Sequence, residues 1–160
     1  PQPFIDERGY LIESFNKEIC KKHIPSVDFV QDNESKSSFG VLRGLHYQDE
    51  PYQQAKLVRV VKGEVQDVAV DLRKSSSTYL QHVSLNLSEK NKKQLYIPRG
   101  FAHGFLVLSK EAIVCYKIDN IFDLNSYKGI RYNDPRININ WQLNDDVIKL
   151  SDKDNKLQYL

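Results

Sequence analysis

The stretch KLVRVVKGEVQDVAVDLR, residues 56–73, decides the fold class of this 160-residue chain. Gly63 divides the stretch, because glycine readily forms the turn between two strand-forming segments. In the second half two sets of residues alternate along the chain: Val65, Asp67, Ala69 and Asp71 against Gln66, Val68, Val70 and Leu72. A period of two is expected of a β-strand whose two faces have different surroundings. The stretch therefore predicts two consecutive strands joined by a turn.

Similar short segments rich in Val, Leu, Ile and Tyr follow one another along most of the chain, at residues 10–15, 80–88, 93–98, 104–109 and 112–118. Only KEICKKHI (17–24) and DDVIKLSDKD (145–154) are typical of helix, the second as a short turn. Many short strands separated by polar residues indicate a sandwich or barrel, and the chain length suits one domain. We therefore expect residues 1–160 to form a single all-β domain, a jelly-roll β-barrel with a few short helices.

The charge balance excludes several classes of partner. The chain has 23 Lys and Arg against 21 Asp and Glu, so its net charge is only +2 and we expect no nucleic-acid partner. No apolar run approaches the roughly 20 residues that span a bilayer, and no secretory leader opens the sequence, so we expect no membrane association and a cytoplasmic location. Cys20 and Cys115 match no CxxC spacing, and we expect buried free thiols.

Polar side chains inside the apolar strands raise the question of function. The segment VLRGLHYQ (41–48) places an arginine and a histidine three positions apart among strand-forming residues. Lys56 opens the following strand, Asp67 and Asp71 lie inside the next, and His103 lies between apolar residues in PRGFAHGF. Buried charge is costly without a partner, so several such residues on inward faces indicate a polar cavity. Each residue alone is more simply explained as structural or solvated, so the hypothesis depends on their convergence.

A metal site is the first alternative, because jelly-roll barrels often hold metal ions on histidines. Such a site needs three or more His, Cys or carboxylate ligands, commonly with two histidines two residues apart on one strand face. Here the residue two positions after His46 is Gln48, and His23 and His82 lie in surface-like contexts. Only His46 and His103 remain as candidate ligands, so the sequence disfavours a metal site.

Five longer segments carry a resemblance that covers almost the whole chain: FIDERGYLIESF (4–15), QDNESKSSFG to RKSSSTY (31–79), QLYIPRGFAHGFLVLS (94–109), CYKI (115–118) and GIRYNDPRININW (129–141). In this order they resemble the dTDP-4-dehydrorhamnose 3,5-epimerase family, metal-free cupins that invert carbons beside the ketone of nucleotide-linked 4-keto-6-deoxy sugars. The resemblance implies a cupin-type jelly roll, a nucleotide-diphosphate sugar as substrate, a homodimer with the site inside the barrel, and no metal or organic cofactor.

The resemblance also implies catalytic roles for four residues. Proton removal beside a ketone needs a base, a cation near the developing enolate and an acid on the other face of the sugar. His46 would be the base, and Asp154 would pair with it and stabilise the imidazolium. Lys56 would stabilise the enolate at the C4 oxygen. Tyr116 would return a proton from the opposite face, so that the carbon is inverted.

Further positions of the chain match the substrate-binding positions of the family. Arg43 would grip the diphosphate, because a guanidinium presents a planar fork of donors that fits phosphate oxygens. His103 would line the sugar site. Five residues would hold the nucleotide, with the N-terminal ones contributed by the other subunit: Phe4, Arg8, Glu13, Gln31 and Asn33. Phe122 departs from the family, which usually has a substrate-contacting tyrosine there. The lost hydroxyl removes a hydrogen bond worth on the order of 1 kcal/mol.

The sequence leaves several functions open. The expected reaction is inversion at C3, C5 or both, most simply on a dTDP-linked 4-keto-6-deoxyhexose. A GDP-linked 4-keto-heptose is an alternative substrate for the same chemistry. A 3,4-ketoisomerase would use the same proton shuttle to move the carbonyl. An inactive sugar-nucleotide-binding cupin would bind without proton exchange, and the joint presence of His46, Lys56, Tyr116 and Asp154 argues against it.

Overall fold

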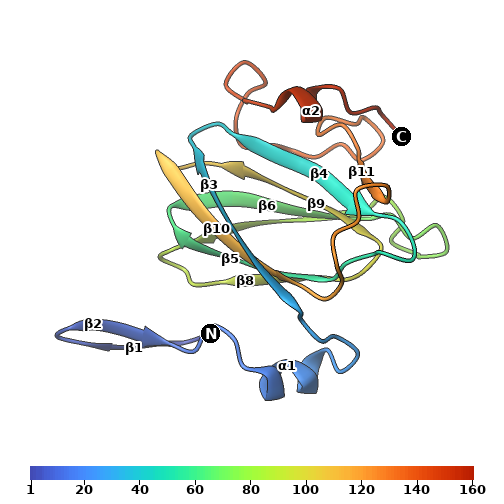
Figure 1. Cartoon of the computed structure of the whole chain (residues 1–160). Coiled ribbons are helices and arrows are strands. Elements are labelled where there is room, and N and C mark those ends of the chain that lie inside the picture. Colours follow the sequence, from blue (N-terminus) through green and yellow to red (C-terminus); the bar gives the residue numbers. More distant parts are fainter.

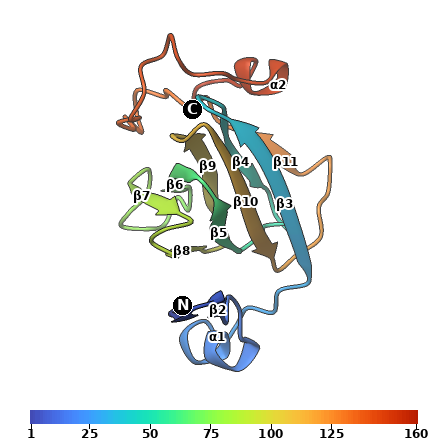
Figure 2. The same cartoon turned by 90° about the vertical axis from the view of Figure 1, so that its left-hand side faces the viewer.

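The computed structural model describes residues 1–160 and contains eleven strands and two short helices (Figure 1). One antiparallel sheet has the order β3, β10, β5 and β8: Gln31–Ser38, Glu111–Ile118, Lys56–Lys62 and Gln94–Ile97. The second has the order β11, β4, β9, β6 and β7: Tyr127–Gly129, Leu42–Gln48, Phe101–Val107, Glu64–Asp71 and His82–Ser88. The two sheets form the body of the barrel (Figure 2). This arrangement confirms the expected all-β jelly roll.

The main core lies between the two sheets and draws residues from both. Val58 and Val114 come from the four-stranded sheet, whereas Val65, Ala69 and Phe105 come from the five-stranded one. Burial of these apolar side chains at about 25 cal/mol per Å² is the main stabilising contribution to the barrel. The predicted alternation along residues 65–72 is confirmed at this point, because one of its two sets faces this core.

The other set of β6 residues lies on the outer face of the same sheet, which is buried too. Val68 and Val70 pack there against Ile130 and Ile137 of the C-terminal segment. Gln66, fully buried, donates from Nε2 to the Asn140 carbonyl oxygen at 2.9 Å and accepts from the Gln142 backbone N–H at 2.8 Å. The C-terminal segment therefore covers the outer face of the five-stranded sheet.

The strand β3 was not predicted from sequence. Its residues QDNESKSS are all polar, yet the strand pairs with β10 along its whole length, from Gln31 opposite Ile118 to Ser38 opposite Glu111. The reason is its place at the edge of the four-stranded sheet, where only Ser37 is buried and no apolar periodicity is required. The short strands β1 and β11 were missed for the same lack of pattern.

The two predicted helical segments have different outcomes. The helix α1, Lys17–His23, is confirmed, and the Asn16 side chain caps it by accepting from the backbone N–H groups of Glu18 and Ile19. Near the C-terminus only α2, Asp152–Asn155, is helical, so the prediction of helix from residue 145 was too long. Neither helix is both long enough and apolar enough to cross a bilayer. Cys20 and Cys115 are free, as predicted, but only partly buried.

The N-terminal hairpin projects away from the barrel (Figure 1). It is formed by β1, Pro3–Asp6, and β2, Gly9–Ile12, and it forms a two-stranded sheet of its own. Three of its large apolar side chains are more than two-thirds exposed: Phe4 at 71%, Ile5 at 79% and Leu11 at 73%. The hairpin therefore leaves most of its apolar surface uncovered by the rest of the chain.

A β-bulge in β4 explains how Arg43 and His46 lie on the same face. On the neighbouring strand β9, Arg43 is opposite Phe105 and His46 is opposite His103. Phe105 and His103 are two residues apart and share a face, but residues three apart in a regular strand face opposite sides. The register shift between Arg43 and His46 inserts the additional residue, so both side chains point into the barrel.

Gly44 makes this bulge possible. Its φ of 139° lies in the region that only glycine adopts readily. A Cβ atom at this position would lie 2.5 Å from the Cα atom of Gly104 on the neighbouring strand. Both the backbone conformation and the close approach of the two strands therefore exclude a side chain.

We expect Gly44→Ala to lower the free energy of unfolding by about 2–4 kcal/mol, because backbone strain and a steric collision add together. Denaturant unfolding followed by circular dichroism measures this change. Gly9→Ala is the control, since Gly9 has a φ of 130° but nothing within 4 Å of the added Cβ atom. The control should lose less, about 1–2 kcal/mol, because it adds backbone strain without the collision. A Gly44→Ala protein as stable as the wild type would contradict this account of the bulge.

Candidate active site

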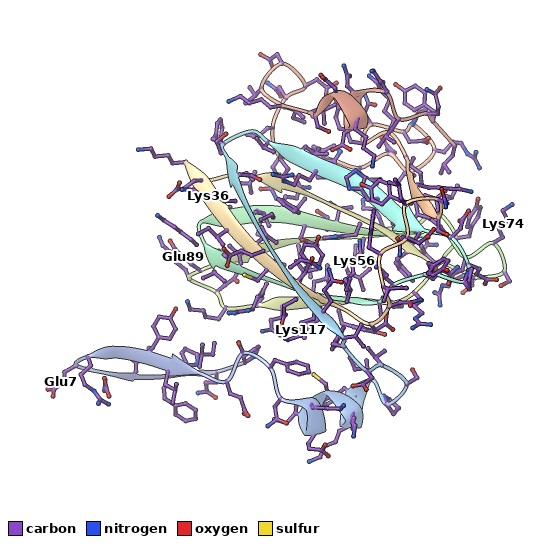
Figure 3. The ribbon with its side chains drawn as sticks, viewed as in Figure 1. Glu7, Lys36, Lys56, Lys74, Glu89 and Lys117 are labelled. Carbon is purple, nitrogen blue, oxygen red and sulfur yellow. The ribbon has the colours of Figure 1, made fainter.

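A cavity of about 320 Å³ inside the barrel brings together half of the predicted site residues, including all four with predicted catalytic roles. We call it the central cavity, and its lining includes the six predicted residues Arg43, His46, Lys56, His103, Tyr116 and Asp154. In Figure 3 Lys56 lies among the strands of the barrel, whereas Lys36, Lys74 and Glu89 lie at the periphery. The predicted convergence of polar residues therefore occurs in the folded chain.

Strand register explains why Lys56 and Tyr116 point into the cavity. Lys56 lies opposite Ile118, and Val58 lies opposite Tyr116, on the neighbouring strands β5 and β10. Opposite residues of an antiparallel pair share a face, and so do residues two apart on one strand. Since Val58 belongs to the core between the sheets, Lys56 and Tyr116 face the same interior.

The two histidines enter the cavity from the other sheet. His46 on β4 is directly opposite His103 on β9, so both imidazoles lie on the inward face. They therefore reach the cavity from the five-stranded sheet, while Lys56 and Tyr116 reach it from the four-stranded sheet. An imidazole and a phenol from opposing walls can act on opposite faces of one bound molecule.

His46 is hydrogen-bonded to Asp154 from the short helix α2. The Nε2 atom of His46 lies 2.6 Å from Oδ1 of Asp154, whose side chain is 5% exposed. Ser151 caps the helix by accepting from the Asp154 backbone N–H at 3.1 Å and so fixes the carboxylate. Burial raises the pKa of Asp154, but the hydrogen bond and charge of His46 outweigh it and hold that pKa below its ordinary value. The carboxylate therefore stays ionised and orients the imidazole.

His103 forms a second pair, with Asp67, deeper in the cavity wall. Its Nε2 atom lies 3.0 Å from both carboxylate oxygens of Asp67, and both residues are buried. Burial lowers the pKa of His103, although Asp67 partly opposes this effect. The His103 imidazole is therefore uncharged at pH 7. We assign it the role of a hydrogen-bonding group and not that of the catalytic base.

Lys56 is a cation whose pKa is lowered by burial. Burial lowers the pKa of its ammonium from 10.5 to about 8, and the charge of Asp67 opposes the shift only in part. At neutral pH the group is mainly protonated, and it has no salt-bridge partner within the chain. A partly desolvated, unpaired ammonium is well suited to stabilise a negative charge that develops on a bound molecule.

Tyr116 is held in its protonated form. Burial raises the pKa of its phenol, while the nearby charge of Arg43 opposes the rise. The Arg43 guanidinium itself donates from Nε to the Ser37 hydroxyl at 3.0 Å. Its Nη2 atom also makes a long hydrogen bond of 3.5 Å to the Lys36 carbonyl oxygen. The remaining N–H groups of the guanidinium are available to an anionic ligand.

A second cavity of about 190 Å³, here called the side cavity, shares four residues with the central one: His46, Lys56, Tyr116 and Tyr127. It also contains three predicted binding residues, Gln31, Asn33 and Phe122. Gln31 donates from its side-chain amide to the Asn33 oxygen at 2.8 Å. The two cavities together offer space for a ligand with a sugar at one end and a larger group at the other.

Three predicted nucleotide-binding residues lie outside both cavities. Phe4 and Arg8 lie on the projecting hairpin, where Arg8 pairs with Asp6, and Glu13 accepts from the Asn16 side chain. Within one chain they therefore do not meet the other site residues. Asp71, grouped with the inward-facing residues from sequence, is also not a cavity residue, because its carboxylate accepts from Arg73, Ser76 and Thr78.

Sequence reasoning missed five residues of the central cavity: Ser35, Phe105, Tyr127, Ser151 and Lys153. Tyr127 lies in NSYKGI, where no apolar alternation marks a strand, and Lys153 lies beside Asp154 in a charged tail. From the sequence, Lys153 could have been predicted only because it directly precedes Asp154. No group of three or more His, Cys, Asp or Glu side chains is arranged to hold a metal ion.

Comparison with known proteins finds relatives over the whole chain. The family model described as dTDP-4-dehydrorhamnose 3,5-epimerase matches residues 1–160. A dTDP-4-dehydrorhamnose 3,5-epimerase from Shigella flexneri is 56% identical over 155 residues, which cover 96% of this chain and 84% of the relative.

Two solved structures are similar over nearly the full length of this chain. One is dTDP-6-deoxy-D-glucose-3,5-epimerase from Legionella pneumophila in complex with dTDP-4-keto-L-rhamnose, with a TM-score of 0.95 and 46% identity over 99% of this chain and 84% of that chain. The other is dTDP-4-dehydrorhamnose 3,5-epimerase from Bacillus anthracis with TDP and PPi bound. It has a TM-score of 0.96 and 42% identity over 100% of this chain and 91% of that chain.

We expect Lys56→Met to raise the thermal midpoint at pH 7, because the folded state holds a desolvated charge there. The unfolded chain binds this proton with a pKa near 10.5 and the folded chain with a pKa of about 8. Below pH 8 both states are protonated and the penalty is complete, whereas between pH 8 and 10.5 the folded state loses the proton first and the penalty fades. Scanning calorimetry at pH 7 and pH 10 should therefore find the larger gain at pH 7.

The control for this experiment is Lys74→Met, which removes a lysine at the periphery of the molecule (Figure 3). It should change the midpoint little at either pH. A Lys56→Met protein less stable than the wild type at pH 7 would contradict the inferred desolvation.

Proposed function

This chain belongs to the dTDP-4-dehydrorhamnose 3,5-epimerase family, and from that premise we propose that it inverts C3 and C5 of a dTDP-linked 4-keto-6-deoxy sugar. Membership makes it an isomerase of the racemase and epimerase class that acts on carbohydrates. The observation that carries the proposal is the central cavity, in which an imidazole–carboxylate pair faces an ammonium and a phenol from the opposite sheet.

In the proposed reaction His46 removes the proton beside the C4 ketone. The ring is paired through Nε2 with Asp154, so its other nitrogen is the one available to the substrate. Pairing with a carboxylate fixes the orientation of the ring and stabilises the imidazolium that forms. C3 and C5 both adjoin the ketone, so one base can serve both carbons in turn.

Lys56 stabilises the enolate that results. Removal of the proton moves negative charge onto the C4 oxygen, and a nearby ammonium in a desolvated site lowers the energy of that state. The lowered pKa of Lys56, about 8, leaves the group cationic at neutral pH. Deprotonation of Lys56 above that pH removes the stabilising charge.

Tyr116 returns a proton to the opposite face of the carbon. It reaches the cavity from the sheet that faces His46, and burial keeps its hydroxyl protonated. Removal from one face and return on the other invert the centre. Side chains of the chain thus supply the base, the cation and the acid.

Arg43 binds the diphosphate, and Gln31 and Asn33 of the side cavity hold the nucleotide. We propose that the site is completed by a second copy of the chain in a homodimer. Phe4, Arg8 and Glu13 would then come from the partner's projecting hairpin, whose apolar side chains are uncovered in the single chain.

Deuterium wash-in tests the proposed function. Incubation with dTDP-4-keto-6-deoxyglucose in heavy water should place deuterium at C3 and C5, read by mass spectrometry and NMR. Exchange at C3 alone would define a 3-epimerase, a 3-keto product would define a ketoisomerase, and parallel assays with GDP-linked 4-keto-heptoses test the other substrate class. The absence of exchange at both carbons of every 4-keto sugar would refute the proposal.

His46→Asn should abolish exchange at both carbons, with at least a thousandfold loss, while the affinity for dTDP stays within a few fold. The loss follows because no other group replaces the base. His23→Asn, on the exposed surface of α1, is the matched control and should retain full activity. Wild-type turnover in His46→Asn would show that the base is misassigned.

Tyr116→Phe separates proton removal from proton return. We expect it to reduce formation of the inverted product by about a hundredfold or more, and to reduce wash-out of a substrate deuterium much less. Comparison of the two rates by NMR measures the difference. An equal fall in both rates would contradict the role of Tyr116 as the acid.

A further inference from the structure

Tyr127 lies on the same wall of the central cavity as His46. On the neighbouring strands β11 and β4, Tyr127 is opposite Gln48 and Gly129 is opposite His46. Tyr127 and His46 are therefore diagonal neighbours on one inward face, and their ring centroids are 5.2 Å apart. Tyr127 lines both the central and the side cavity, so it borders the space on the base side of any bound sugar.

The ring of Tyr127 is fixed by contacts on several sides. Phe122 packs at a centroid distance of 5.5 Å and His46 packs on another side. The Lys153 ammonium lies 3.6 Å from the ring centroid, in a cation–π contact. Because Lys153 precedes Asp154 on α2, the same short helix that orients the His46 imidazole also holds the Tyr127 ring.

The hydroxyl of Tyr127 is free to bind a ligand. It forms no hydrogen bond within the chain, and it is not one of the buried polar side-chain atoms that lack a partner. Burial, the charge of Asp154 and the nearby Tyr116 all raise the pKa of this phenol, so it stays protonated and can donate at any working pH. The adjacent Phe122 ring has no such group, so in this pair of packed rings the phenolic donor is Tyr127.

We propose that Tyr127 is a positioning residue whose hydroxyl binds a sugar oxygen and holds the ring against His46. This inference rests on the proposed epimerase function. The sugar must shift between the step in which C3 lies beside His46 and the step in which C5 does. The geometry of the Tyr127 hydrogen bond therefore differs between the two steps. Tyr127 therefore sets the balance between inversion at C3 and inversion at C5.

The test is Tyr127→Phe, which removes the hydroxyl and keeps the ring contacts with Phe122, His46 and Lys153. We expect kcat/KM to fall about fivefold to tenfold, as for the loss of one hydrogen bond made in the transition state. The ratio of deuterium incorporation at C3 and C5 should change at least threefold relative to the wild type. The affinity for dTDP and the thermal midpoint should stay unchanged, since neither depends on this hydroxyl.

Tyr79→Phe is the matched control, because Tyr79 is also a partly buried tyrosine but lines neither cavity. It should leave both the rate and the exchange ratio unchanged. An unchanged exchange ratio in Tyr127→Phe, or a loss of rate matched by a lower thermal midpoint, overturns the inference. A wild-type protein that exchanges no deuterium at either carbon would instead refute the proposed function, so the two failures are distinguishable.

Discussion

The β-bulge between Arg43 and His46 is the constraint on which the site depends. Without the additional residue, an arginine and a histidine three positions apart would face opposite sides of the sheet. The bulge turns both into the barrel, where Arg43 can meet an anion and His46 can meet Asp154. It requires Gly44, because the backbone has a positive φ and the neighbouring strand leaves no room for a Cβ atom. A local irregularity of the sheet thus creates the arrangement that a regular strand would forbid.

The charged groups of the central cavity lower the stability of the folded state, because burial removes them from water. Two carboxylates are buried, and each is matched by a histidine: Asp154 by His46 and Asp67 by His103. Lys56 has no such partner, and its lowered pKa records the cost of desolvation. An apolar residue would suit the fold better at this position. The retention of an unpaired ammonium beside the apolar core of the barrel is expected of a site that must stabilise charge on a bound molecule.

Sequence reasoning succeeded where burial imposes a pattern and failed where it does not. The strands β5, β6 and β10 face the core, so their apolar residues recur with the period of the pleat and were predicted. The strand β3 is polar throughout and exists because the β10 backbone pairs with it. The α2 helix is too short to show a periodicity, yet it positions Asp154 and Lys153. Tyr127 was missed because its short strand is defined by pairing alone.

The sequence by itself determined the fold class, the polar residues that interrupt the apolar strands and, through the order of its segments, the family. Those properties depend on short stretches of sequence or on the sum of such stretches along the chain. Only the tertiary structure decided that His46, 108 positions from Asp154, lies within hydrogen-bonding distance of it, and that Tyr127 borders the same cavity. It also separated Asp71 and the N-terminal hairpin from that cavity. The physical reason is that strand pairing, register and a bulge fix distances between residues remote in sequence, and no short-range pattern encodes them.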